Sequence, residues 1–100
     1  MEQFLYKLKL KTIYLNNENW TEKEEEIINR HFLRLKKYTE EGKVILAGRT
    51  LNEDNSGFGI VIFEAESETS ARQFMESDPA ISEGMMDGIL FPYRVALMRK

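Results

Sequence analysis

The chain of 100 residues has no cysteine, only one histidine and only two prolines. Without cysteine, disulfide bonds, thiolate nucleophiles and cysteine-ligated metals are excluded, and a single imidazole excludes metal sites that need two, such as HExxH. Redox chemistry would therefore require a bound cofactor. We expect no cofactor and no metal.

Basic residues and long apolar runs are also scarce. Fourteen Lys and Arg residues stand against 17 Asp and Glu, giving a net charge of −3, which disfavours nucleic acid as a partner. No apolar run reaches the ~20 residues of a membrane span, and the N-terminal residues MEQFLYKLKLK alternate like a strand, unlike a signal peptide. We expect a single cytoplasmic domain over residues 1–100 that does not bind membranes, because 42% hydrophobic residues suffice for one core.

The strongest local signal lies in residues 21–49, a helix that leads directly into an apolar strand. Thr21 and Glu24 have the spacing of a capping box, and Gly42 suits the left-handed conformation that ends a helix. The apolar stripe of this helix comprises Ile27, Ile28, Leu35 and Tyr38. His31 lies at the centre of the stripe and is predicted to face inward. It is either a core histidine with a hydrogen-bond partner or a site residue that changes charge near neutral pH.

Period-two alternation and turn residues divide the rest of the chain. The predicted strands cover residues 4–11, 44–51, 58–65 and 89–98, with a polar loop at 14–20 and a hairpin turn at 52–57. A second helix is predicted from Ser67 to Asp78, because Pro79 ends it. Asp78 also suits the cap of a short helical turn over residues 79–83, which Gly84 closes. Pro92 has no N–H to donate, so the last strand is expected at a sheet edge.

The order β-α-β-β-α-β predicts an α+β fold, a ferredoxin-like antiparallel sheet with both helices on one face. Residues 44–47 (VILA) and 60–63 (IVIF) are apolar on both sides of their strands, whereas a solvated face would alternate. Monomers seldom expose an apolar face of this size. We therefore expect a homodimer in which two sheet faces meet. Either Val61 or Ile62 points toward the partner, and the pattern leaves this choice open.

The same order of elements belongs to the RNA recognition motif. Residues 56–63, SGFGIVIF, resemble the third-strand signature of that motif, and residues 12–17, TIYLNN, resemble its first-strand signature. The leading basic residue is missing, and Ile60 stands where a stacking aromatic is expected. RNA binding dependent on Phe58 is thus a third hypothesis, and we expect no specific RNA binding.

A second resemblance extends over most of the chain. RHFLRLKKYTEEGKVILAG, then GIVIFEAES, then SDP followed by a glycine, and finally Pro92 and Tyr93 resemble the YciI family of small bacterial proteins. The resemblance implies a YCII-related domain that forms a dimeric α/β barrel, in which two ferredoxin-like sheets pack face to face. It also implies a site built from the helix histidine and the AspPro aspartate, which are His31 and Asp78 here.

Three further residues are candidates for ligand contacts. Arg49 stands where family members commonly have proline, and its charge either favours an anionic ligand or is simply solvated. Tyr6 and Tyr93 either line the same cavity or are core aromatics with one polar tip.

The leading functional hypothesis is an enzyme in which Asp78 orients His31 for proton transfer on a small anionic or phenolic ligand. The chain has no GxSxG motif and no phosphate-binding glycine loop, so its residues support lyase, isomerase or dehydrochlorinase chemistry. The alternative is a non-catalytic dimeric module that binds a ligand or assists another protein. Oxygen-dependent monooxygenase chemistry is a further option.

Overall fold

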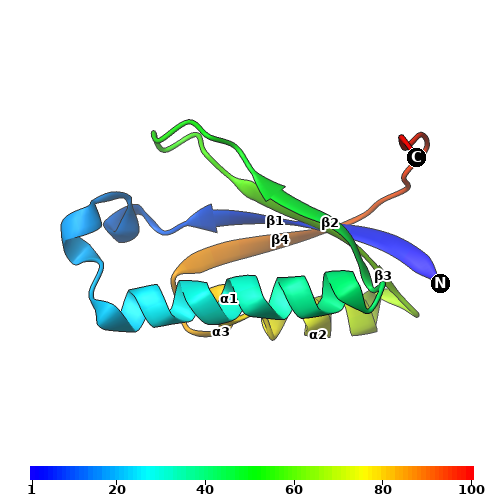
Figure 1. The fold of residues 1–100 in the computed structure, drawn as a ribbon, viewed down its shortest axis with the longest axis horizontal. Coiled ribbons are helices and arrows are strands. Elements are labelled where there is room, and N and C mark those ends of the chain that lie inside the picture. Colours follow the sequence, from blue (N-terminus) through cyan, green and yellow to red (C-terminus); the bar gives the residue numbers. More distant parts are fainter.

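The computed structural model describes residues 1–100 as one antiparallel sheet with its helices on one face (Figure 1). The strands are β1 (Glu2–Leu10), β2 (Val44–Arg49), β3 (Gly59–Ala65) and β4 (Met86–Pro92), and the α-helices are α1 (Glu22–Glu40), α2 (Glu68–Glu76) and α3 (Pro79–Ser82). Two 3-10 helices, η1 (Thr12–Leu15) and η2 (Asn17–Asn19), occupy the predicted polar loop. The strand order β2-β3-β1-β4, antiparallel throughout, confirms the predicted ferredoxin-like α+β fold, the subunit fold of dimeric α/β barrels.

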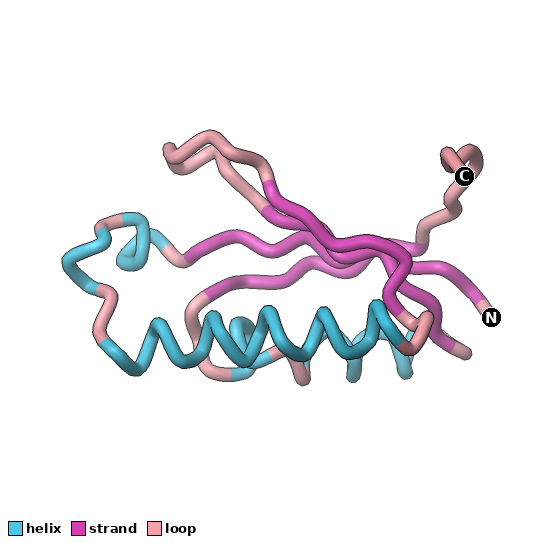
Figure 2. The backbone as a smooth tube through the Cα atoms, viewed as in Figure 1, coloured by secondary structure: helices cyan, strands magenta, loops and turns pink.

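The register of the sheet decides which side chains face the helices. Tyr6 on β1 pairs with Val61 on β3, and both are buried in the layer between sheet and helices. Their neighbours Leu5 and Ile62 also pair, and because side chains alternate along a strand they point to the opposite face. Ile62 therefore belongs to the face without helices, which answers the question that the sequence pattern left open. Figure 2 shows this second face of the sheet without any covering layer.

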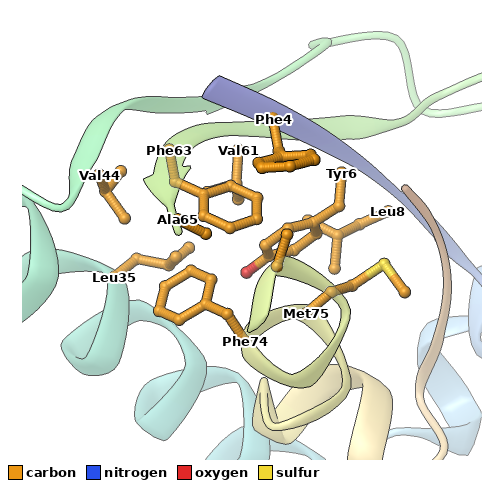
Figure 3. Packing of buried hydrophobic residues seen from close by; sticks show 11 residues of the cluster. Phe4, Tyr6, Leu8, Leu35, Val44, Val61, Phe63, Ala65, Phe74 and Met75 are labelled. Atoms are coloured by element: carbon orange, nitrogen blue, oxygen red, sulfur yellow. The ribbon is translucent and has the colours of Figure 1, made fainter. Parts of the chain in front are cut away.

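The core lies between the sheet and the two longer helices (Figure 3). It consists of Phe4, Tyr6, Leu8, Leu35, Val44, Val61, Phe63, Ala65, Ala71, Phe74 and Met75. The ring centroids of Phe63 and Phe74 are 4.7 Å apart, and those of Tyr6 and Phe63 are 5.6 Å apart. Burial of each large side chain contributes roughly 1.5–3 kcal/mol, so this cluster fixes the helices on the sheet.

Helix α1 begins and ends as predicted. The Thr21 side chain accepts a hydrogen bond from the first turn and Glu24 accepts one from the Thr21 N–H, which is the predicted capping box. Gly42 has φ +88°, the left-handed conformation that ends the helix. Ile27 and Leu35 in the apolar stripe are buried, and the His31 side chain between them is 14% exposed. The inward orientation of His31 is therefore confirmed.

The prediction of a strand over residues 89–98 was wrong at both ends. The strand begins earlier because Gly88 is part of it, where a Cβ would lie only 2.6 Å from the Ile81 side chain. The strand ends at Pro92, which pairs with Phe4 near the start of β1, so little of β1 remains as a partner beyond it. β4 does lie at an edge of the sheet, as Pro92 predicted. Similarly, β2 ends at Arg49, two residues before the predicted end.

None of the helices is long and apolar enough to cross a membrane.

Candidate functional site

The site is centred on a hydrogen bond between His31 on α1 and Asp78, the residue that caps α3. His31 Nδ1 lies 2.7 Å from Asp78 Oδ1. An exposed ion pair between Arg30 and Glu83 joins the same two parts of the chain. The two residues that the sequence suggested as a pair are therefore in direct contact, although 47 residues separate them along the chain.

Asp78 is held in place by its own backbone as well as by the core. Its side chain accepts a hydrogen bond from the Ala80 N–H at 3.0 Å, and Pro79 occupies the first turn of α3, as predicted for a helix cap. Gly84, with φ +84°, follows the end of this short helix. The cap and the contact with His31 use the same oxygen, so the two roles of Asp78 coexist.

Tyr6 is the third member of this cluster. Its hydroxyl donates a hydrogen bond to Asp78 Oδ2 at 2.7 Å, and neither residue has exposed surface. The Asp78 carboxylate thus accepts from Tyr6, His31 and Ala80. Because an ionised carboxylate can only accept, His31 must carry a proton on Nδ1. The other ring nitrogen, Nε2, has no hydrogen-bond partner in the chain and is free to accept or donate a proton.

The pKa values of Asp78 and Tyr6 agree with this assignment of protons. Burial alone would raise the pKa of Asp78, but the hydrogen bond and charge of His31, with the Tyr6 and Ala80 donors, hold it below its usual value. Burial raises the pKa of Tyr6 far above its usual value, and the charge of Asp78 and the hydrogen bond to it raise it further. Asp78 therefore stays ionised near neutral pH, and Tyr6 stays a donor.

Arg34 lies one turn after His31 on α1 and was missed in the sequence. Its guanidinium is 4.3 Å from the centre of the Phe74 ring and donates a hydrogen bond to the Phe74 carbonyl at 2.9 Å. Nη1 is buried and has no hydrogen-bond partner. The charge of Arg34 partly offsets the rise in the pKa of Tyr6, so the guanidinium acts on the same cluster. The spacing of three residues from His31, which puts both on one helix face, was the available signal.

The other sequence candidates are not part of this cluster. Arg49 is exposed at the end of β2, and its guanidinium lies 3.4 Å from the Thr50 carbonyl. Tyr93 is exposed after β4 and donates its backbone N–H to the Gln3 carbonyl. Neither contacts His31 or Asp78. Tyr6 is buried behind Asp78, which matches a core aromatic with a polar tip and not a residue lining a cavity.

The structure contains one hollow of about 290 Å³, but its lining does not include the His31 and Asp78 pair. It is lined mainly by polar side chains of β1 and by Asp87 and Ile89 of β4. No group of three or more His, Asp or Glu side chains is arranged to hold a metal ion.

The fold and the buried His-Asp contact define a subunit of the dimeric α/β-barrel class, and comparison with known proteins identifies the family. The family described as the YCII-related domain matches residues 10–95. The chain therefore belongs to this family, which confirms the resemblance seen in the sequence.

One solved structure similar to the chain is a 5-chloro-2-hydroxyhydroquinone dehydrochlorinase from Burkholderia phenoliruptrix in complex with 2,5-dihydroxybenzoquinone. The TM-score is 0.68 with 21% sequence identity, and the match covers 92% of this chain and 93% of the other. At this identity the likeness establishes the shared fold. No curated protein matches the chain in sequence.

Proposed function

We propose that the protein is a small acid/base enzyme in which His31 Nε2 moves a proton on a small anionic or phenolic ligand. The observation that carries this proposal is the 2.7 Å contact between His31 Nδ1 and a fully buried carboxylate. Asp78 holds the imidazole in one tautomer and stabilises the positive charge that forms when Nε2 takes a proton. A buried, fully hydrogen-bonded carboxylate is well suited to this task because it cannot turn away from the ring.

The ligand class follows from what an imidazole can do. A base near neutral pKa removes protons from acidic groups, such as a phenolic O–H or a carbon next to a carbonyl. Return of the proton at another position gives an isomerase, and loss of a leaving anion gives a lyase or dehydrochlorinase. The ligand in the structurally similar dehydrochlorinase, 2,5-dihydroxybenzoquinone, belongs to this class of compound. Arg49 and Tyr93 remain proposed ligand contacts.

We further propose that the protein is a homodimer, built through the sheet face opposite the helices. This open face consists of Leu5, Leu46, Ile60, Ile62, Ile89 and Phe91. Ile89 is 54% exposed and Phe91 is 44% exposed in the single copy. A second copy would cover this apolar surface, and a standard interface buries ~800 Å² on each partner. The cytoplasmic location expected from the composition stays a prediction.

The test combines binding with turnover. Thermal shift with 2,5-dihydroxybenzoquinone and substituted hydroquinones should identify ligands, and absorbance should then report their conversion. His31→Ala should abolish conversion, and Asp78→Asn should lower kcat by about 10²–10⁴-fold, the usual contribution of acid/base catalysis. Asp87→Asn is the matched control, because Asp87 is exposed and pairs only with Lys11. It should leave conversion unchanged.

A ligand-binding module without catalysis is the second candidate. It is favoured by the structural roles of Asp78, which caps α3 and binds Tyr6 in the core. Tight binding without conversion, retained in His31→Ala, would support the module and contradict the enzyme.

A further inference from the structure

Residues 93–100 have the pattern of a strand but lack a partner. Tyr93, Val95 and Leu97 alternate with Arg94, Ala96 and Met98, which is why the sequence predicted a strand here. In the single chain this segment forms no strand, and its only backbone hydrogen bonds run from the Tyr93 and Val95 N–H groups to Gln3. Leu97 is 94% exposed and Met98 is 66% exposed. The segment therefore presents apolar side chains and free backbone groups together.

The position and charge of the segment point away from its own subunit. In Figure 1 the chain leaves the end of β4 and turns to the side of the sheet opposite α1, the side of the open face. Arg94, Arg99 and Lys100 supply three of the 14 basic residues, so the rest of the chain has 11 basic against 17 acidic residues. A basic apolar segment thus extends from an acidic body without folding back onto it.

The sheet has one other edge on which a strand can be added. β4 forms one edge and β2 the other, so the outer backbone groups of β2 are unpaired. Residues 46–49 of β2 are exposed along this edge. Exposed acidic residues flank β2 at both ends, Glu40 and Glu41 before it and Glu53 and Asp54 after it.

We propose that residues 93–100 dock on a second copy of the chain, along the outer edge of its β2. The inference rests on the sheet-face homodimer proposed above. A two-fold axis that runs along the strands puts the β4 edge of each copy against the β2 edge of its partner, within reach of the segment. Added strands of this kind bind through main-chain hydrogen bonds, while alternate side chains fill apolar sites. The acidic residues at both ends of β2 suit the basic end of the segment, whichever way it runs.

The absence of cysteine allows a direct test of this contact. Leu97→Cys with a nitroxide spin label is mixed with ¹⁵N-labelled copies that carry no label. Amide signals of residues 46–49 in the ¹⁵N copies should broaden, because only an intermolecular contact brings the label to them. A label on Asn29→Cys, exposed on α1, is the control and should leave these signals sharp. Sharp signals with the Leu97 label, or broadening confined to β4, would overturn the proposal.

A second measurement separates this inference from the dimer itself. Sedimentation should show that Leu97→Asp raises the dimer dissociation constant tenfold or more, while circular dichroism stays unchanged because Leu97 touches little of its own subunit. If the wild type dimerises and Leu97→Asp dimerises equally well, the docking of the segment is refuted and the sheet-face dimer stands. If the wild type is a monomer at every concentration reached, both are refuted.

Discussion

Replacing Tyr6 by Phe removes one buried hydroxyl and leaves the ring. The ring packs against Phe63 and Phe74, with centroids 5.6 Å and 6.3 Å away, so the apolar contacts of the core should survive. The hydrogen bond that disappears runs to Asp78 Oδ2, which is buried and has no other donor in the chain. The substitution therefore tests the support of the Asp78 carboxylate and little else.

The expected loss follows from the charge and burial of the acceptor. Hydrogen bonds to charged groups contribute about 1.5–3 kcal/mol, and leaving the buried partner unsatisfied places the cost toward the upper half of that range. Tyr38→Phe is the matched control: Tyr38 also packs against Phe74, at 5.1 Å, but its hydroxyl has no hydrogen bond in the chain. Removal of that hydroxyl should change the free energy of unfolding by less than about 0.5 kcal/mol.

Urea denaturation at pH 7, at equal protein concentrations, gives both values. The predicted result is a loss of about 2–3 kcal/mol for Tyr6→Phe against almost none for Tyr38→Phe. Equal and small losses for the two variants would mean that the Tyr6 hydroxyl does not support Asp78, and the account of the cluster would fail.

Three other perturbations follow from the structure. The pKa of Asp78 lies below its usual value, so its stabilisation is present above the unfolded pKa of about 3.9 and lost as pH falls through the folded pKa; wild type and Asp78→Asn should converge in stability in acid, and a constant gap in unfolding titrations would contradict this. Gly88→Ala would put a Cβ 2.6 Å from Ile81 and should cost about 1–3 kcal/mol in thermal unfolding, whereas Gly48→Ala meets nothing within 4 Å and should cost little; equal costs would refute the close packing of β4 on the helices. Phe91→Lys on the open face should give a folded monomer near 11.8 kDa by sedimentation, and an intact dimer would place the interface elsewhere.

Local signals were enough to predict most of the fold. Thr21 with Glu24, and Asp78 with Pro79, are caps whose partners lie within three residues, so their geometry depends on neighbouring backbone alone. Gly42 and Gly84 have positive φ, a conformation that glycine adopts without strain. The period of 3.6 residues placed His31 on the buried side of α1 for the same reason.

Contacts between distant residues could not be predicted in this way. Tyr6 meets Asp78 across 72 residues, and no pattern in either segment specifies that the hydroxyl points at the carboxylate. Arg34 stacks on Phe74 across 40 residues, and a charged residue in a helix is ordinarily assigned to solvent. The end of β4 was also missed, because the length of a strand depends on where its partner β1 begins and not on its own alternation.

The central claim is that Asp78 holds the His31 proton on Nδ1 and leaves Nε2 free for proton transfer. Because His31 is the only histidine, long-range ¹H–¹⁵N correlation spectra of the wild type report its ring nitrogens without overlap. At a pH at which the ring is neutral, the account predicts a protonated Nδ1 and an unprotonated Nε2. A neutral ring protonated on Nε2 would contradict it, because the contact with Asp78 could not then be a hydrogen bond from histidine to an ionised carboxylate.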